Sequence, residues 1–167
     1  MQGDASLASI YEKLGVVTHY SAKDHSIHLK KQGDITKALT LNLINTPDIA
    51  QTLAVTCFGL GIACQFSGLH TLKIKETDRL VALQTELAKL GAEVLIDPQS
   101  LALQPHSVIK DQVAIATYND HRMAMAFAPL ALLHPIEVEK PDVVSKSYPQ
   151  FWEDLESLGF MIEKVDA

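Results

Sequence analysis

The sequence lacks the features of several broad classes of function. Only two of its 167 residues are cysteines, and it contains no Gly-rich phosphate loop, nucleophile elbow or Cys/His dyad. Its 14 Lys and Arg are outnumbered by 20 Asp and Glu, and the formal net charge of −6 argues against non-specific binding to nucleic acid or an anionic membrane. Because we find no secretory signal and no apolar run long enough to cross a bilayer, we expect a cytoplasmic protein.

The two cysteines and the scattered placement of the seven histidines also argue against a metal centre. Cys57 and Cys64 fall on an apolar run that predicts one helix, along which they are too far apart for a disulfide. We therefore expect buried thiols in a reducing compartment. His121 has no second ligand at a suitable spacing, so we expect no zinc.

What the chain does contain is a repeated pattern of helices and strands. Gly15, Gly91 and Gly159 each end a predicted amphipathic helix, in the contexts Glu-Lys-Leu-Gly-Val, Ala-Lys-Leu-Gly-Ala and Glu-Ser-Leu-Gly-Phe. Each repeat runs helix, Gly, two strands, a third strand, buried helix and strand. The pattern predicts one α+β domain of pseudo-symmetric repeats of a β/α unit, with buried helices and small mixed sheets. The first and last copies are incomplete, so we expect an incomplete domain.

Hydrophobic periodicity and helix-end signals give the expected elements. The expected helices are Ala5–Leu14, Pro47–Cys64, Asp78–Leu90, Met123–Leu133 and Gln150–Leu158. The expected strands are Val16–Tyr20, Ser26–Lys30, Ala38–Leu43, Phe66–Ile74, Ala92–Ile96, Leu101–Leu103, Val113–Thr117, Ile136–Glu139 and Met161–Val165. Thr77 is the expected N-cap of the third helix, because its hydroxyl can accept from a first-turn N–H group.

Charged residues gather at the starts of the predicted helices. They are Asp48, Lys75, Glu76, Asp78, Arg79, Asp120, His121, Arg122 and Lys146. Three of these helix starts carry a cation that the helix dipole disfavours, and several N-termini on one face would form an anion pocket. Arg suits phosphate or carboxylate through its bidentate fork, and Lys supplies a point charge. The residues alone thus favour an anion-binding domain.

The carboxylates beside these cations have two interpretations. They can act as general acid and base, or they can cap helices and pair with the cations. By position alone Asp48 and Asp120 are more often caps, and Asp78 is expected to be structural. A non-catalytic anion-binding module of the same fold is therefore the alternative to an enzyme.

Three segments carry a resemblance to a known family. They are Leu-Lys-Ile-Lys-Glu-Thr-Asp-Arg at 72–79, Tyr-Asn-Asp-His-Arg-Met-Ala-Met at 118–125 and Ser-Lys-Ser-Tyr-Pro-Gln-Phe-Trp at 145–152. They resemble the motifs of 5-enolpyruvylshikimate-3-phosphate synthase, also called 3-phosphoshikimate 1-carboxyvinyltransferase. The resemblance covers essentially the whole chain. It implies an enolpyruvyl transferase-like fold, in which residues 1–167 form a single, N-terminally truncated C-terminal domain of a two-domain enzyme.

The resemblance also implies a reaction. The family transfers the enolpyruvyl group of phosphoenolpyruvate to the 5-hydroxyl of shikimate 3-phosphate and releases phosphate, in the shikimate pathway of aromatic amino acid biosynthesis. It requires no metal and no organic cofactor. The missing N-terminal domain would be the partner of this chain, and the fragment alone is expected to be inactive.

The resemblance assigns roles to individual residues. Asp48 matches a residue that contacts the shikimate hydroxyls and accepts a proton, and Glu76 matches the proton donor to the enol methylene. Lys75 matches a ligand of the shikimate phosphate, and Thr71 stands where some relatives place an Asn that binds substrate. The cations that match those holding phosphoenolpyruvate are Arg79, Arg122 and Lys146.

Overall fold

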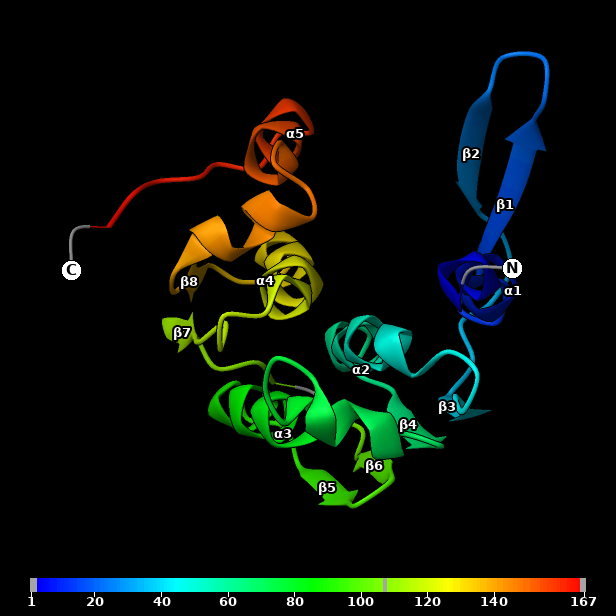
Figure 1. Ribbon diagram of the computed structural model, residues 1–167. Coiled ribbons are helices and arrows are strands. Elements are labelled where there is room, and N and C mark those ends of the chain that lie inside the picture. Colours follow the sequence, from blue (N-terminus) through cyan, green and yellow to red (C-terminus); the bar gives the residue numbers. More distant parts are fainter. Residues whose placement is uncertain (1–2, 107, 166–167) are drawn as a thin grey trace.

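The computed structural model describes residues 3–106 and 108–165 (Figure 1). Its α-helices are α1 (Leu7–Glu12), α2 (Ala50–Gly59), α3 (Arg79–Lys89), α4 (His121–Phe127) and α5 (Phe151–Ser157). Its strands are β1 (Val16–Ser21), β2 (Ser26–Lys31), β3 (Ala38–Asn42), β4 (Ala63–Ser67), β5 (Val94–Asp97), β6 (Ser100–Leu103), β7 (Val113–Ile115) and β8 (Ile136–Val138). Short 3₁₀ helices span Gly3–Ser6, Pro47–Ile49, His70–Ile74, Ala128–Leu132 and Pro141–Lys146.

The elements repeat in the predicted order, which confirms the α+β architecture of pseudo-symmetric copies. The first copy comprises α1, β1, β2, β3, α2 and β4, the second comprises α3, β5, β6, β7, α4 and β8, and α5 begins a third. In each full copy the first two strands form an antiparallel hairpin, and the strands that flank the buried helix pair in parallel. Gly15, Gly91 and Gly159 follow the three corresponding helices with φ of 80°, 101° and 97°, a left-handed conformation that favours glycine.

A four-stranded sheet of order β3-β4-β6-β5 joins the two full copies. Its central contact is the antiparallel pairing of β4 with β6, which places Phe66 opposite Leu101 and Cys64 opposite Leu103. All four side chains are buried. Within the described residues β1–β2 and β7–β8 remain two-stranded, and Figure 1 shows the β1–β2 hairpin projecting away from the helices and the larger sheet.

Helix α2 lies at the centre of the main core. Its side chains are buried almost all round, as the apolar sequence predicts, and Leu53, Ala54, Cys57 and Phe58 are each 0% exposed. α2 packs against both α3 and α4. The starts of these helices therefore lie near one another, which positions the charged residues described below. None of the helices in the described part of the chain has the length and apolar character that a membrane span requires.

The segment after α2 differs from the prediction. The helix expected to reach Cys64 ends at Gly59, and the expected strand Phe66–Ile74 is the end of β4 followed by the 3₁₀ helix His70–Ile74. Glycine causes both breaks, because Gly61 and Gly68 adopt φ of 68° and 78°. Apolar periodicity does not separate a buried helix from a buried strand, so the sequence pattern placed the boundary too late.

The relation between the two cysteines also changes. Cys57 lies on α2 and Cys64 on β4, so the prediction that they share one helix is wrong. Both are buried free thiols, as expected. A side-chain hydrogen bond with Cys57, followed by burial, raises the pKa of the Cys64 thiol, so Cys64 remains protonated in the core.

The expected strand Met161–Val165 does not form. Residues 160–165 adopt neither helix nor strand, and Met161 and Val165 are 97% and 70% exposed. A single extended segment gains no ladder hydrogen bonds without a neighbouring strand, and none pairs with it in the described structure. Helix α4 is also shorter than predicted, since it gives way to 3₁₀ geometry before Pro129.

Gly68 provides a test of this local structure. We expect Gly68→Ala to lower the free energy of unfolding by about 2–5 kcal/mol, from left-handed backbone strain plus overpacking. An added Cβ would lie 2.6 Å from the Ile44 nitrogen and 2.7 Å from Asn42 Oδ1. Gly33→Ala is the matched control, because Gly33 has a φ of 92° with nothing within 4 Å of the added Cβ. Urea unfolding measures the free energy of unfolding of the two variants. Equal decreases in Gly68→Ala and Gly33→Ala would contradict the steric argument.

Candidate functional site

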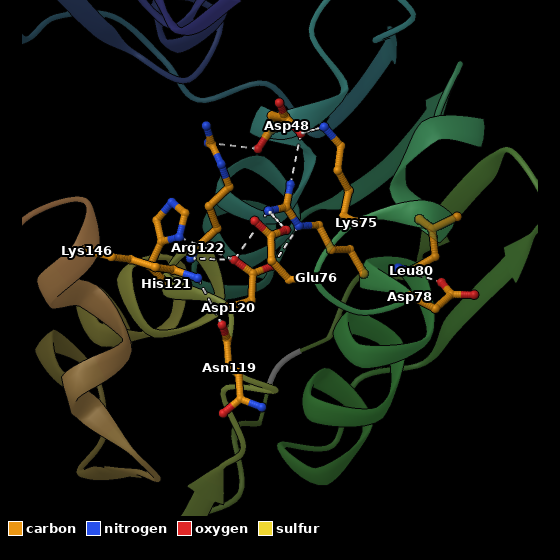
Figure 2. Close-up of polar contacts among 11 residues, drawn as sticks. Asp48, Lys75, Glu76, Asp78, Leu80, Asn119, Asp120, His121, Arg122 and Lys146 are labelled. Atoms are coloured by element: carbon orange, nitrogen blue, oxygen red, sulfur yellow. Dashed lines mark hydrogen bonds and ion pairs between the residues drawn. The ribbon is translucent and has the colours of Figure 1, made fainter.

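The charged residues singled out in the sequence meet where α2, α3 and α4 begin (Figure 2). Asp48 lies in the 3₁₀ helix Pro47–Ile49 that leads into α2, and Lys75 and Glu76 precede α3. Arg79 is the first residue of α3, and Arg122 is the second residue of α4. The two repeats therefore contribute to one cluster.

Arg79 is the centre of the cluster. It is 3% exposed, and its Nε donates to Asp120 Oδ2 at 2.6 Å. Its Nη1 donates to Asp48 Oδ1 at 2.9 Å and its Nη2 donates to Glu76 Oε2 at 2.8 Å, with a longer bond of 3.4 Å to Asp120 Oδ1. Three carboxylates thus surround one buried guanidinium. Such pairing is what makes a buried charge tolerable.

Asp120 connects this ion pair to helix α4. Its carboxylate is fully buried, and its Oδ1 accepts from the backbone N–H of Arg122 at 2.9 Å, so Asp120 is also the N-cap of α4. The cap interpretation of Asp120 therefore holds. Asp48 instead lies inside a 3₁₀ helix and directs its carboxylate to cations, so the interpretation of Asp48 as a cap is wrong.

The N-cap of α3 lies one residue later than predicted. Asp78 Oδ1 accepts from the backbone N–H groups of Leu80 and Val81, both at 3.2 Å, so Asp78 and not Thr77 caps the helix. Asp78 has extended backbone angles, as an N-cap requires. Its structural role agrees with the sequence interpretation.

The environment of Asp48 favours the ionised carboxylate. Lys75 Nζ lies 3.2 Å from Asp48 Oδ1, and both side chains are more than 30% exposed. Partial burial by itself raises the pKa of Asp48, but Lys75, Arg122 and Arg79 outweigh it and hold that pKa below its usual value. Asp48 is therefore charged at neutral pH and can accept a proton or a hydrogen bond.

Arg122 and Lys146 carry the more accessible cations on the α4 side. Arg122 Nη1 donates to the backbone carbonyl of Asp48 at 3.1 Å and lies 3.9 Å from Asp4 Oδ1. Lys146 is exposed and donates to the backbone carbonyl of Asn119 at 3.3 Å. It ends the 3₁₀ helix Pro141–Lys146 rather than starting α5, so its expected place in a first helical turn is wrong.

His121 borders the cluster as a neutral imidazole. Burial lowers its pKa, Asp120 raises it, and Arg122 and Lys146 lower it further, for a net shift below the usual value. Its Nδ1 is 3.8 Å from Asp120 Oδ1 and has no hydrogen-bond partner among the described residues. The described part of the chain contains no group of three or more side chains suited to hold a metal ion.

Two further features are an unpartnered hydroxyl and an open cavity. Thr71 lies on the 3₁₀ helix His70–Ile74, and its buried hydroxyl has no hydrogen-bond partner within residues 3–106 and 108–165. An open cavity of about 270 Å³ adjoins Asp48. Its lining residues are Asp4, Asn45, Thr46, Pro47, Asp48, Ile49 and Arg122. The cavity thus has a carboxylate and an Arg in its wall.

Sequence reasoning missed Glu86, a buried carboxylate on α3. Glu86 is 0% exposed and accepts from Tyr118 Oη at 2.7 Å, from the Ala116 N–H at 3.0 Å and from Lys89 Nζ at 2.7 Å. Burial, then the bond to Glu86, raises the pKa of Tyr118 to about 12, so the hydroxyl remains a donor. The sequence signal that could have revealed Glu86 is a carboxylate on the apolar, buried face of the amphipathic helix α3.

Glu86 secures the strained segment before Asp120. Tyr118 and Asn119 adopt left-handed φ of 53° and 57°, which is unfavourable for residues other than glycine. Helix α3 holds this segment twice, with Glu86 at Tyr118 and with Arg79 at Asp120. Since Lys146 contacts the Asn119 carbonyl, the same segment also fixes that cation.

Comparison with known sequences agrees with this arrangement. The sequence profile described as EPSP synthase (3-phosphoshikimate 1-carboxyvinyltransferase) matches residues 1–155. The 3-phosphoshikimate 1-carboxyvinyltransferase of Bacteroides fragilis is 45% identical over 165 residues, which are 97% of this chain and 40% of that protein. The protein of the same name from Neisseria meningitidis is 31% identical over 159 residues, 95% of this chain and 36% of that protein. The chain thus spans about 40% of the length of these curated relatives.

Solved structures show the same fold. EPSP synthase from Acinetobacter baumannii aligns with a TM-score of 0.79 at 19% identity, over 96% of this chain and 40% of that chain. The enolpyruvyl transferase NikO from Streptomyces tendae aligns with a TM-score of 0.59 at 15% identity, over 93% of this chain and 35% of that chain. The fold is therefore enolpyruvyl transferase-like, and on the match over residues 1–155 the chain belongs to the EPSP synthase family.

Proposed function

We propose that this chain is part of a cytoplasmic enzyme that transfers the enolpyruvyl group of phosphoenolpyruvate to the 5-hydroxyl of shikimate 3-phosphate and releases phosphate. The reaction belongs to the shikimate pathway of aromatic amino acid biosynthesis. The observation that carries the proposal is the cluster at the starts of α2, α3 and α4, where Asp48 and Glu76 lie directly beside Arg79. The proposed reaction is that of the family, and the cluster contains carboxylates and cations suited to that reaction.

We further propose that residues 1–167 form a single, N-terminally truncated C-terminal domain of a two-domain enzyme. The length of the relatives supports this, since the chain covers only 40% of the Bacteroides fragilis protein. The charge of the cluster supports it as well. Neighbouring carboxylates nearly balance the cations, so little positive charge remains for two substrates that each carry a phosphate. The missing N-terminal domain would supply the other substrate-binding groups.

The proton transfers are assigned to the two half-exposed carboxylates. Asp48, ionised beside Lys75 and Arg79, accepts the proton of the 5-hydroxyl as its oxygen attacks C2 of phosphoenolpyruvate. Glu76 donates a proton to the methylene carbon and so completes a tetrahedral intermediate. Phosphate then leaves with the proton held by Asp48, and the Glu76 carboxylate takes back one methyl proton, which restores the enol ether and both carboxyl groups. For these roles, each carboxyl group must lie within hydrogen-bonding distance of the substrate atom that loses or gains the proton.

Anion binding is assigned to the cations and to Thr71. Lys75, Arg122 and Lys146 are accessible, and they can face the shikimate phosphate and phosphoenolpyruvate. Arg79 is also assigned to phosphoenolpyruvate, although four of its five N–H donors are already bonded, which leaves one Nη1 hydrogen for a substrate. The unpartnered hydroxyl of Thr71 can bind a substrate oxygen.

A complementation assay tests the proposed function. We expect the 167-residue chain alone to release no phosphate from phosphoenolpyruvate plus shikimate 3-phosphate above background, because half of the site is absent. Adding the separately produced remainder of the Bacteroides fragilis relative, the N-terminal part that this chain does not cover, should restore turnover. Turnover by the chain alone at the rate of an intact synthase would contradict the truncated-domain proposal. Co-elution of the two parts without turnover would instead favour a non-catalytic anion-binding module.

Glu76→Gln tests the proton donor in the complemented enzyme. The Gln Oε1 can still accept from Arg79 Nη2, but the amide has no acidic proton to transfer. We therefore expect kcat to fall by about 10²–10⁴-fold while KM changes little. Glu93→Gln is the control, since Glu93 is exposed, lies between α3 and β5, and makes none of the hydrogen bonds and ion pairs described for the cluster. An unchanged kcat in Glu76→Gln would refute the assignment.

Tyr118→Phe tests the role of Glu86 in positioning the site. It removes the donor to a buried carboxylate oxygen, so we expect the free energy of unfolding to drop by about 1–3 kcal/mol. We also expect kcat/KM of the complemented enzyme to fall, because the segment that holds Asp120 and Lys146 loosens. Tyr148→Phe is the matched control, since its bond to Asp154 is at the surface. Equal effects in the two variants would argue against a positioning role.

A further inference from the structure

Arg122 is the guanidinium of the cluster that keeps most of its donors free. Within the described part of the chain, the one hydrogen bond of this guanidinium runs from Nη1 to the backbone carbonyl of Asp48 (Figure 2). A guanidinium has five N–H donors, so four remain for a ligand. Arg79, by contrast, donates four of its five to carboxylates. Arg122 is therefore the better anion ligand, because a free fork can bind phosphate or carboxylate with two hydrogen bonds.

The carboxylate of Asp4 lies beside this free fork. Its Oδ1 is 3.9 Å from Arg122 Nη1, and both residues line the open cavity of about 270 Å³. That separation is too long for a hydrogen bond, so the two side chains attract each other through charge alone. The side chain of Asp4 is 60% exposed and that of Arg122 is 29% exposed, so water reaches both. The pair is therefore weak, and an incoming anion can replace Asp4 at the guanidinium.

Asp4 is held less firmly than the other carboxylate in the cavity wall. Asp48 Oδ1 accepts from Arg79 Nη1 at 2.9 Å, which fixes the Asp48 carboxylate. The Asp4 carboxylate makes no hydrogen bond to any residue that the structure describes. Its backbone is nevertheless anchored, because the 3₁₀ helix Gly3–Ser6 packs against α1 and against the 3₁₀ helix Pro47–Ile49. Asp4 thus combines a fixed backbone position with a side chain that is free to move.

The charge balance of the cluster gives Asp4 a specific effect. The cations of the cluster are Lys75, Arg79, Arg122 and Lys146. The carboxylates bonded to Arg79 are Asp48, Glu76 and Asp120. Asp4 is the additional carboxylate, and it lies next to the cation that has the most free donors. It therefore offsets the positive charge that would otherwise attract an anion into the cavity.

We propose that Asp4 competes with the anion that Arg122 binds and so limits how tightly the cavity holds phosphate and phosphate-bearing ligands. In the free protein Asp4 partly neutralises the guanidinium. When an anion binds, Asp4 gives up this contact and then repels the anion from the side, which favours release. The identification of this anion as phosphoenolpyruvate, or as the phosphate product, rests on the proposed function. The competition itself depends only on Asp4 and Arg122.

Titration of the 167-residue chain with inorganic phosphate tests the proposal without requiring turnover. The backbone amide signals of Asp120 and Arg122, followed by NMR at constant ionic strength, report binding in the cavity. We expect Asp4→Asn to bind phosphate about two- to five-fold more tightly than the unmodified chain, the range that an exposed ion pair supports. Asp4→Glu keeps the charge, so its dissociation constant should stay close to that of the unmodified chain. Arg122→Gln should abolish the response in either background.

Asp34→Asn is the matched control for the change in net charge. Asp34 is exposed, lies between β2 and β3, and does not line the cavity. Its replacement should leave the dissociation constant unchanged. Equal tightening in Asp4→Asn and Asp34→Asn would overturn the proposal, because the effect would then follow net charge and not position. An unchanged dissociation constant in Asp4→Asn would also overturn it, as would absence of phosphate binding in that variant. A larger dissociation constant would overturn it as well, and would show that Asp4 instead orients Arg122 for binding.

The complemented enzyme extends the test to the proposed reaction. There Asp4→Asn should lower the KM for phosphoenolpyruvate and the inhibition constant for phosphate by about two- to five-fold, because both anions would lose the same competitor. Tighter phosphate binding by the chain in NMR, together with no turnover after complementation, would contradict the proposed function and leave the competition by Asp4 supported. Turnover with a KM and an inhibition constant that Asp4→Asn does not lower would support the proposed function and overturn the role of Asp4.

Discussion

The buried Arg79 is the interaction on which this part of the molecule depends. Its guanidinium is removed from water by the same packing that buries α2, so its charge must be matched by protein groups. Asp48, Glu76 and Asp120 supply that match from three different segments. Removing one partner of such a pair typically costs about 3–5 kcal/mol. One side chain therefore fixes the relative positions of the starts of α2, α3 and α4.

Helix α3 works as a rigid spacer between two polar attachments. Arg79 at its first turn holds Asp120, and Glu86 two turns later holds Tyr118. Tyr118 and the adjacent Asn119 adopt left-handed conformations, which persist because the segment is bonded at Tyr118 and at Asp120. The strain has a structural result, since it turns the Asn119 carbonyl toward Lys146 and the Asp120 carboxylate toward Arg79.

The sequence predicted the repeat and the convergence of charges, but not the contacts that order them. Glycines at helix ends and cations in first turns have local causes, so a single sequence reveals them. The boundary between α2 and β4 is not local, because an apolar run suits a buried helix and a buried strand equally. Glu86 and Tyr118 are 32 residues apart, and nothing in the spacing indicates their bond. Thr77 and Asp78 are both good caps, and only the backbone angles select Asp78.

The repeat itself explains why a site forms at this point. The shared sheet interleaves strands of both copies, in the order β3-β4-β6-β5, so the helices that follow and precede those strands are brought side by side. Each copy then contributes a helix start to a common face, and an anion site arises without any single phosphate-binding motif. Within this sheet β4 of the first copy pairs with β6 in the hairpin of the second copy, so the two copies share backbone hydrogen bonds. Shared strands thus account for the convergence of the helix starts that form the charged cluster.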